Sequence, residues 1–293
     1  MQSSKTPLRG RVAAVTGAAR GIGRATAAAL VREGVAVAIG DLDLALAEQT
    51  ARELGNGTLA LRLDVTSRAS VRAFLDEVED RLGPLDVLVN NAGIMLVGRP
   101  LWEEDDEAAR RQYEVNVNGT LYGIKEAVPR FRARGHGHIV NVASGAGLIG
   151  FAGGGSYCGT KHYVIGVSEA LRAELRGSGV EVSCVMPAVV NTELASGGGA
   201  VRGLRSVEPE QVADAIVNAV KGRRFDVYVP RELEVLDRLQ GLLPRRVFEA
   251  LLRLSGGADL LIRIDTAARA EYERRAFASA GAVDDEPWTV SAP

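Results

Sequence analysis

Short runs of β-branched and other apolar residues alternate with helix-length segments along most of the chain. The apolar runs occupy residues 11–16, 35–40, 58–63, 85–90, 138–143, 180–185 and 225–229. Helical patterns separate them, with clear examples at residues 22–33, 42–54 and 71–82. Nearly continuous apolar strands that alternate with helices form parallel sheets covered on both faces. The sequence therefore predicts a doubly wound α/β fold of about seven strands, joined by right-handed crossovers.

The composition argues against several other classes of protein. The formal net charge is −2, so no overall charge favours nucleic acid as a partner. The start of the chain lacks the apolar region of a secretory signal, and no window reaches the ~18 apolar residues that a membrane-spanning helix needs. We therefore expect a cytoplasmic protein.

The spacing of cysteines and histidines does not match a disulfide framework or a metal centre. Cys158 and Cys184 lie in apolar segments, which predicts buried free thiols. His136, His138 and His162 have no accompanying cluster of carboxylates or cysteines at zinc-site spacing. We expect no metal ion at the site.

A glycine-rich segment follows the first predicted strand. It reads T-G-A-A-R-G-I-G and places Gly17, Gly21 and Gly23 just before an alanine-rich helix. Ligands of doubly wound sheets bind at the carboxyl ends of the strands, where glycines let the backbone approach a pyrophosphate at a helix N-terminus. The pattern predicts a dinucleotide site, and its place between a strand and a helix makes it stronger than glycine spacing alone.

Asp41, at the end of the second predicted strand, bears on which dinucleotide binds. A carboxylate at this position can accept hydrogen bonds from both hydroxyls of the adenosine ribose, and it repels a 2′-phosphate. Arg20 in the glycine-rich segment is a cation that could instead bind that phosphate, or could simply be solvated. We favour NAD as the cofactor and keep NADP as the alternative.

Two further polar segments follow the third and fourth predicted strands. Asp64 could accept a hydrogen bond from the adenine amino group, or else Asp64 or Ser67 could cap the next helix. The segment N-N-A-G at residues 90–93 could bring the backbone close to the ribose, or could form an ordinary turn. Both segments lie at the edge of the sheet where we expect the nucleotide.

The segment S-Y-C-G-T-K places Tyr157 and Lys161 four residues apart at the start of a predicted helix, so that they share one face. A free tyrosine titrates near ~10, and service as a base near neutral pH needs a downward shift of about three units, or about 4 kcal/mol. A nearby ammonium favours the phenolate. We therefore expect Lys161 to lower the pKa of Tyr157, so that the phenol can exchange a proton with an alcohol.

Taken together, these segments resemble the short-chain dehydrogenase/reductase family, whose fold is of the Rossmann type. The resemblance rests on residues 16–23, 90–93 and 116–119, on Ser144 and on residues 157–161, and it extends over roughly residues 9–230. It implies an NAD(P)-dependent oxidoreductase that acts on CH–OH groups and forms a homodimer or homotetramer. A non-catalytic module that senses NAD and docks a partner is the alternative from a different functional class.

The resemblance also implies catalytic roles. Tyr157 is the expected acid/base, and Lys161 also holds the hydroxyls of the nicotinamide ribose. Ser144 is expected to hydrogen-bond the substrate oxygen, and Asn116 to anchor a water that relays protons to Lys161. The alternatives are that Ser144 caps the end of a strand and that Asn116 lies at a helix kink.

The segment M-P-A-V-V-N-T at residues 186–192 resembles the part of the family that holds the nicotinamide carboxamide, by the Val190 backbone and by Thr192. Ala188 stands where the family usually has glycine, which should narrow the floor of the pocket. The predicted cofactor contacts are Gly17, Arg20, Gly21, Ile22, Gly23, Asp41, Asp64, Val65, Asn91, Ala92, Gly93, Tyr157, Lys161, Pro187, Val190 and Thr192.

Apolar residues predominate where we expect the substrate pocket. The expected lining comprises Met95, Leu96, Leu148, Ile149, Phe151, Val189 and the loop at residues 193–204. No arginine is placed to bind a substrate carboxylate. The lining predicts a hydrophobic secondary alcohol or ketone, of steroid, terpenoid or long-chain type.

Residues 231–293 extend beyond the family core, which we assign to residues 1–230 as one catalytic domain. Apolar residues from Leu236 to Leu254 recur at helical spacing with arginines between them, and Pro244 must break or kink this segment. A second helix is expected at residues 259–277. This amphipathic extension could pack on the core or on a sister subunit, or could lie on a membrane surface near a lipophilic substrate.

Overall fold

A single parallel sheet forms the centre of the computed structural model, which describes residues 7–196, 206–257, 259–262 and 264–278. Within this part of the chain seven strands lie in the order β3-β2-β1-β4-β5-β6-β7, and all neighbours are parallel. The strands are β1 (Val12–Thr16), β2 (Ala36–Asp41), β3 (Leu59–Arg62), β4 (Val87–Asn90), β5 (Gly137–Val142), β6 (Val180–Pro187) and β7 (Asp226–Val229). The predicted doubly wound, Rossmann-type sheet is confirmed.

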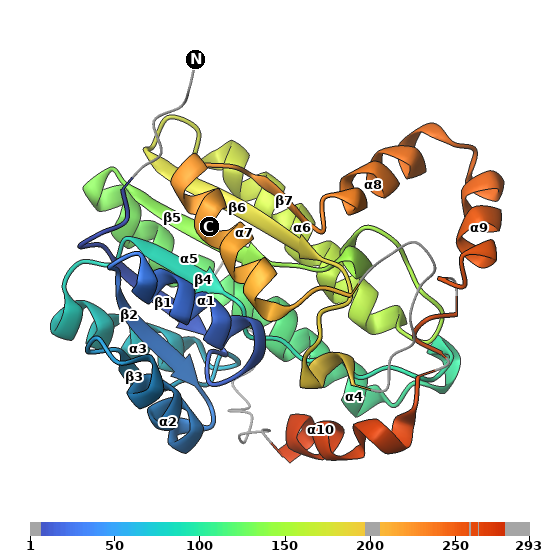
Figure 1. The fold of residues 1–293 in the computed structure, drawn as a ribbon, viewed down its shortest axis with the longest axis horizontal. Helices are drawn as coiled ribbons and strands as arrows, with labels where there is room; N and C mark the ends of the chain where they lie inside the picture. Colours follow the sequence, from blue (N-terminus) through green and yellow to red (C-terminus); the bar gives the residue numbers. More distant parts are fainter. Residues whose placement is uncertain (1–6, 197–205, 258, 263, 279–293) are drawn as a thin grey trace, which may run out of the picture.

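Helices cover both faces of the sheet (Figure 1). One face carries α1 (Gly21–Arg32), α2 (Leu44–Leu54) and α7 (Pro209–Gly222), and the other carries α3 (Arg68–Leu82), α5 (Gly119–Arg134) and α6 (Gly155–Glu174). The described chain also contains α4 (Asp106–Gln112) and a π-helical turn, η2 (Tyr113–Asn118), which runs directly into α5.

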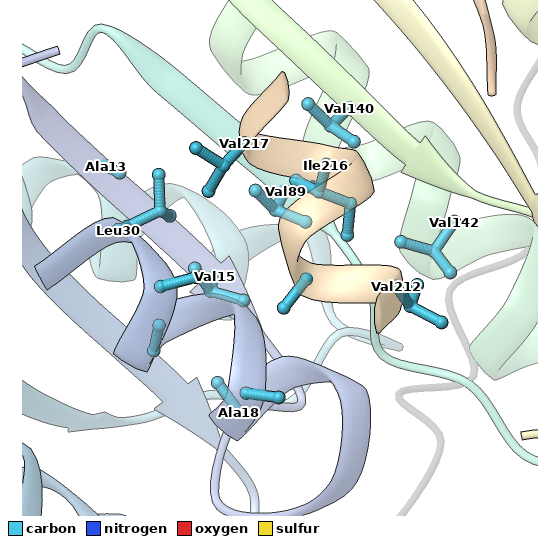
Figure 2. Packing of buried hydrophobic residues seen from close by; sticks show 14 of the residues in the cluster. Ala13, Val15, Ala18, Leu30, Val89, Val140, Val142, Val212, Ile216 and Val217 are labelled. Carbon is cyan, nitrogen blue, oxygen red and sulfur yellow. The ribbon is translucent and has the colours of Figure 1, made fainter. Parts of the chain in front are cut away.

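Alternate residues of the strands point to opposite faces, which gives the core two layers. Ala13 and Val15 of β1 pack on the first face, where Figure 2 shows them near Leu30 of α1. Ile216 of α7 lies beside Val89 of β4 in the same cluster. Val12 and Ala14 pack on the second face. Fully burying a side chain such as Leu30 or Ile216 contributes about 1.5–3 kcal/mol, so this packing fixes the sheet against its helices.

The boundaries of the predicted elements shift where side chains cap them. The predicted start of the third helix moves from residue 71 to Arg68, because the Ser67 Oγ accepts a hydrogen bond from the Ser70 N–H over 3.3 Å. The helix expected at residues 259–277 begins later in the structure and is shorter. It is α10 (Thr266–Ala278), and turns precede it.

The chain leaves β7 through α8 (Glu232–Leu242) and α9 (Arg245–Leu254), which lie at the upper right of Figure 1, and returns through α10 at the bottom of that view. Pro244 separates α8 from α9, as expected for a residue without a backbone N–H. α10 packs near α4, since Ala276 shares a buried cluster with Leu96 and Ala108. Across the described ranges, every helix is too short or too polar to cross a bilayer.

The order of the strands sets the position of the site. β1 and β4 are neighbours, although β2 and β3 lie between them in the sequence. The chain therefore winds outward in opposite directions from this pair, and the segments that follow the two strands diverge and leave a crevice.

Candidate active site

A cleft of about 1860 Å³ opens at the carboxyl ends of the strands. Segments that follow β1, β2, β3, β4, β5 and β6 line it, and so do residues of α8, α9 and α10. The nucleotide motifs lie at one end, and the apolar side chains of the extension lie at the other. We call these the nucleotide end and the substrate end.

Glycines allow the segment after β1 to fold against the segment after β4. Gly17 has a φ of +62°, and a Cβ on it would lie 2.7 Å from the Ala92 Cα. A Cβ on Gly23 would lie 2.4 Å from the carbonyl oxygen of Gly17. The Asn91 side chain closes the arrangement by donating to the carbonyls of Thr16 (2.9 Å) and Gly17 (3.0 Å).

Thr16 is a functional residue that sequence reasoning missed. Its Oγ accepts hydrogen bonds from the backbone N–H groups of Asn91 and Ala92, each over 3.0 Å. The hydroxyl therefore joins the carboxyl ends of β1 and β4 at the crevice. A threonine at the end of a buried strand, directly before the first glycine, was the available signal.

Arg20 and Asp41 form the outer part of the nucleotide end. Asp41 accepts hydrogen bonds from the N–H groups of Ala19 (3.0 Å) and Asp43 (3.1 Å). The Arg20 guanidinium pairs with Asp43 (2.9 Å) and Glu193 (3.3 Å). Arg20 is therefore held between two carboxylates and is not simply solvated.

Of the two predicted candidates for the cap of the helix after β3, Ser67 has this role, and the adenine contact of Asp64 stays a prediction. Ser67 caps α3, as described above, while the Asp64 carboxylate accepts from the Thr66 N–H (2.9 Å) and hydroxyl (2.7 Å). Asp64 and Val65 line the cleft. The aspartate thus fixes the turn that presents this edge of the site.

Tyr157 and Lys161 lie on α6 with exposed fractions of 6% each. The Lys161 Nζ donates to the carbonyl of Val142 at the end of β5 over 3.1 Å, and it lies 6.0 Å from the centroid of the Tyr157 ring. The two side chains share one helix face, as their spacing predicts. The contact with β5 holds the ammonium at the cleft wall.

Asn116 lies in the π-helical turn η2 and binds two other segments. Its Oδ1 accepts from the Ile94 N–H (2.8 Å), and its Nδ2 donates to the Ile94 carbonyl (2.9 Å) and to the Thr160 hydroxyl (3.0 Å). The side chain therefore connects the segment after β4 with α6, next to Lys161. This position agrees with the predicted alternative of a helix kink, because π-helical turns interrupt α-helices, and the water-anchoring role stays a prediction.

The electrostatics of Tyr157 differ from the expectation based on Lys161. Burial raises the pKa of the Tyr157 phenol, while a hydrogen bond with Ser144 and the charge of Arg269 act in the opposite direction. Burial also lowers the pKa of Lys161 to about 8. The expected lowering of the Tyr157 pKa is therefore wrong for the structure as it stands, because removal from water outweighs the neighbouring charges.

Ser144 follows β5 and has the capping role that was one of its two predicted interpretations, while its contact with a substrate oxygen stays a prediction. Its Oγ accepts a hydrogen bond from the Ala146 N–H over 3.1 Å, which caps the short helical turn Gly145–Gly147. The same side chain hydrogen-bonds with Tyr157. Capping therefore fixes the hydroxyl next to the phenol.

The segment after β6 returns toward the glycines. Val190 pairs with Val207, and the Thr192 N–H donates to the Val190 carbonyl over 2.7 Å. A Cβ on Gly21 would lie 3.5 Å from the Thr192 Cγ2, so this threonine closes over the start of α1. Pro187 and Ala188 line the cleft between the two ends.

The family model for short chain dehydrogenases matches residues 11–200. The chain belongs to the short-chain dehydrogenase/reductase family. It is 42% identical over 187 residues to sorbitol dehydrogenase from Cereibacter sphaeroides, across 64% of this chain and 73% of that protein. It is 38% identical over 229 residues to 1-deoxy-11-beta-hydroxypentalenate dehydrogenase from Streptomyces exfoliatus, across 75% and 83% of the two chains.

A solved structure of a short-chain dehydrogenase/reductase from Burkholderia phymatum in complex with NAD superposes with a TM-score of 0.74. The two sequences are 28% identical, and the match covers 81% of this chain and 95% of that one. The present chain is thus an NAD(P)-dependent oxidoreductase that acts on CH–OH groups. Its family match ends before the extension of α8, α9 and α10.

Most of the predicted site residues of this dehydrogenase line one cleft. They are Gly17, Arg20, Gly21, Ile22, Asp41, Asp64, Val65, Asn91, Ala92, Gly93, Ser144, Tyr157, Lys161, Pro187, Val190 and Thr192. Gly23 and Asn116 do not line it. Gly23 packs beneath the glycine segment, and Asn116 is 1% exposed behind the cleft wall. Both therefore shape the site from outside it.

The substrate end differs from the prediction at two positions. Met95, Ile149, Phe151 and Val189 line the cleft as expected. Leu96 instead packs in the buried cluster with Ala108 and Ala276, and Leu148 packs under α8. Of the predicted loop at residues 193–204, positions 197–204 lie outside the described residues.

Sequence reasoning missed the main wall of the substrate end. It is formed by side chains of the extension, among them Leu233, Leu236, Leu239, Phe248, Leu251, Leu261, Ile264 and Tyr272. The glycine run before Tyr157 accommodates this wall, since a Cβ on Gly153 would lie 2.6 Å from the Ile262 Cα. The signals were the helical spacing of leucines beyond residue 230 and the consecutive glycines.

Proposed function

We propose that this dehydrogenase uses NAD to interconvert a hydrophobic secondary alcohol and its ketone, with Tyr157 as the acid/base. The observation that carries the proposal is that Tyr157, Lys161 and Ser144 meet at the junction of the nucleotide end and an apolar substrate end. A module that only senses NAD would have no use for a buried phenol beside an apolar pocket.

The nucleotide end fits a dinucleotide. Gly17 and Gly23 leave a cradle that a Cβ would fill, and the N-cap residue of α1, Arg20, has no side-chain hydrogen bond to the first turn. The first-turn N–H groups are therefore available to a pyrophosphate. A bound nicotinamide would supply or accept the hydride. In this proposal Val190 and Thr192 would hold its carboxamide, and Lys161 its ribose.

The proton chemistry follows from the positions of the hydroxyls. In the direction of reduction, Tyr157 donates its phenolic proton to the substrate oxygen while the carbonyl carbon receives a hydride, and the product is the alcohol. Ser144 orients that oxygen. The raised pKa of Tyr157 keeps the phenol protonated near neutral pH, as an acid must be, and the Lys161 charge stabilises the phenolate that forms.

The charges around Arg20 support NAD over NADP. Asp41, Asp43 and Glu193 surround this side of the nucleotide end, and two of them already neutralise the Arg20 guanidinium. A 2′-phosphate would have to displace these carboxylates and would meet Asp41 as a like charge. A ribose hydroxyl could instead donate to the Asp41 carboxylate.

The apolar wall supports a hydrophobic substrate of steroid, terpenoid or long-chain type. Phe151, Phe248 and Leu261 are typical of the lining, and a pocket of this kind excludes substrates whose hydroxyls it cannot pair. One relative is named for sorbitol, a polyol, and the other for a hydroxypentalenate. The lining favours a substrate less polar than sorbitol.

The extension belongs to the proposal as well. We propose that residues 1–230 form the catalytic domain and that residues 231–293 complete its substrate end. α8 and α9 also expose apolar residues, with Leu242 at 80% and Leu254 at 78%. This exposure supports contact with a sister subunit of a homodimer or homotetramer, or with a membrane surface. These contacts and the cytoplasmic location stay predictions.

The decisive experiment follows nicotinamide absorbance with a panel of hydrophobic secondary alcohols and NAD. The Tyr157→Phe variant should lower kcat by about 10²–10⁴ while NADH binds with unchanged affinity, because only the proton donor is lost. The same panel with NADP tests the cofactor preference. Full turnover by the variant would refute the mechanism, and NADH binding without any turnover would favour the sensing module.

A further inference from the structure

Arg269 of α10 is completely buried, with an exposed fraction of 0%. Its Nη1 donates to the carbonyls of Leu194 (2.7 Å) and Ser196 (3.0 Å), and its Nη2 donates to the carbonyl of Met95 (2.6 Å). Its Nε pairs with Glu273 over 3.3 Å. A buried charge persists only where it is hydrogen-bonded or paired, and this guanidinium is both.

The carbonyl groups bound by Arg269 belong to opposite sides of the cleft. Met95 lies in the segment after β4, whereas Leu194 and Ser196 lie in the segment after β6, and all three residues line the cleft. β5 separates these two strands in the sheet. One planar guanidinium therefore fixes the spacing between two walls that share no strand pairing.

Tyr272, one helical turn further along α10, completes the connection to Met95. Its hydroxyl accepts a hydrogen bond from the Met95 N–H over 2.8 Å, and its ring lies 4.9 Å from the Arg269 guanidinium carbon. Both backbone groups of Met95 are thus satisfied by α10. A residue beyond a strand end has no ladder partner, and here the helix replaces it.

This arrangement adjoins the reacting groups. Met95 and Tyr157 belong to one buried cluster, and Leu194 packs against it. The charge of Arg269 also lowers the pKa of Tyr157, against the larger effect of burial. Movement of either wall would therefore change the space in front of the phenol.

We propose that Arg269 is a positioning residue: by binding Met95 on one side and Leu194 and Ser196 on the other, it holds the substrate end at the width that a hydrophobic substrate requires. Arg269 touches neither substrate nor cofactor in this proposal. The role in substrate binding rests on the proposed function, whereas the joining of the two walls does not.

The test compares Arg269→Gln and Arg269→Lys with Arg274→Gln in the full-length chain. Arg274 lies on the same helix, its side chain is 75% exposed, and it pairs only with Glu271 among the contacts described for it. Lysine keeps the charge of Arg269 but lacks the planar fork that reaches both walls. Tyr272→Phe serves as a milder variant, because it removes only the acceptor for the Met95 N–H.

Hydrogen exchange measures the joining of the walls directly. Backbone amides of residues 94–96 and 192–196 should exchange at least about tenfold faster in Arg269→Gln than in the parent or Arg274→Gln, since local opening becomes easier. Tyr272→Phe should accelerate residues 94–96 alone, and it keeps the test valid if Arg269→Gln does not fold. Unchanged exchange in both variants would overturn the proposal.

Two measurements test the effect on substrate binding. Calorimetry gives the affinity for 2-decanone in the presence of NADH, and steady-state kinetics with 2-decanol and NAD give KM and kcat. For Arg269→Gln and Arg269→Lys we expect the affinity for 2-decanone to fall, and the KM for 2-decanol to rise, by about tenfold. The value of kcat should change less than about threefold, and the affinity for NADH should stay the same. A fall in kcat with KM unchanged would overturn the positioning role. If the parent chain neither binds nor turns over these probes, the hydrophobic-substrate assignment fails, and hydrogen exchange still decides whether Arg269 joins the walls.

Discussion

The two ends of the cleft are built in different ways. At the nucleotide end, Thr16, Gly17 and Asn91 meet because β1 and β4 are neighbours in the sheet, and their contacts are hydrogen bonds to backbone. At the substrate end, Met95 meets Arg269 across a separation of 174 positions in the sequence. The sheet dictates the first geometry, whereas the packing of the extension dictates the second. Changes at either end should therefore affect cofactor and substrate separately.

The largest effect confined to one end of the cleft is expected from Gly23→Ala. The added Cβ would lie 2.4 Å from the Gly17 carbonyl oxygen, and this backbone cannot yield without distorting the cradle. Overpacking of this kind costs about 1–3 kcal/mol, so NADH affinity should fall by up to about 100-fold. Fluorescence titration with NADH measures it.

Gly166→Ala is the matched control for that substitution, because nothing lies within 4 Å of its added Cβ. It should leave NADH affinity unchanged. If Gly23→Ala bound NADH as tightly as this control, the cradle would not be the nucleotide site.

Gly153→Ala is the corresponding substitution at the substrate end, where an added Cβ should again disturb the packing. Gly153 has a φ of +79°, and its added Cβ would lie 2.6 Å from the Ile262 Cα, so the extension must move away from the start of α6. We expect KM for a hydrophobic alcohol to rise by about tenfold while NADH affinity stays the same. Steady-state kinetics and NADH titration on one preparation check both values. A loss of NADH affinity instead would show that the two ends are not independent.

The smallest expected effect comes from Asp41→Asn, which keeps the size of the side chain and removes its charge. The Ala19 and Asp43 N–H groups donate to different oxygens of the carboxylate, so the amide oxygen of asparagine keeps one of these two bonds. Without the repulsion of a 2′-phosphate, the affinity ratio of NADPH to NADH should rise about fivefold, as expected for a partly exposed charge. Parallel titrations with both nucleotides measure the ratio. An unchanged ratio would show that the charge of Asp41 does not disfavour NADPH.

Sequence reasoning placed correctly the candidate residues that lie close to a strand end. Gly17, Asp41 and Tyr157 could be placed because each follows a recognisable strand or begins a helix, and the sheet brings such positions together. The same reasoning gave the wrong direction for the pKa of Tyr157. The spacing of Lys161 shows a nearby charge, but burial depends on the whole fold and outweighs it.

The substrate end could not be derived from local patterns. The leucines beyond residue 230 predicted amphipathic helices, yet no pattern in them specified which surface they would cover. Arg269 looks like any other arginine in a polar helix, and its carbonyl partners are not encoded by side chains at all. Contacts between a side chain and distant backbone produce no recognisable sequence pattern in either segment.

The order of the elements along the chain has a consequence for the newly made protein. The predicted cofactor contacts end at Thr192, and the sheet is complete at Val229, whereas Arg269 and Tyr272 follow about a seventh of the chain later. Domains form as units while synthesis proceeds from the N-terminus. A nascent chain can therefore complete the proposed nucleotide end before Arg269 and Tyr272 are made, and the wall proposed to choose among alcohols forms only afterwards.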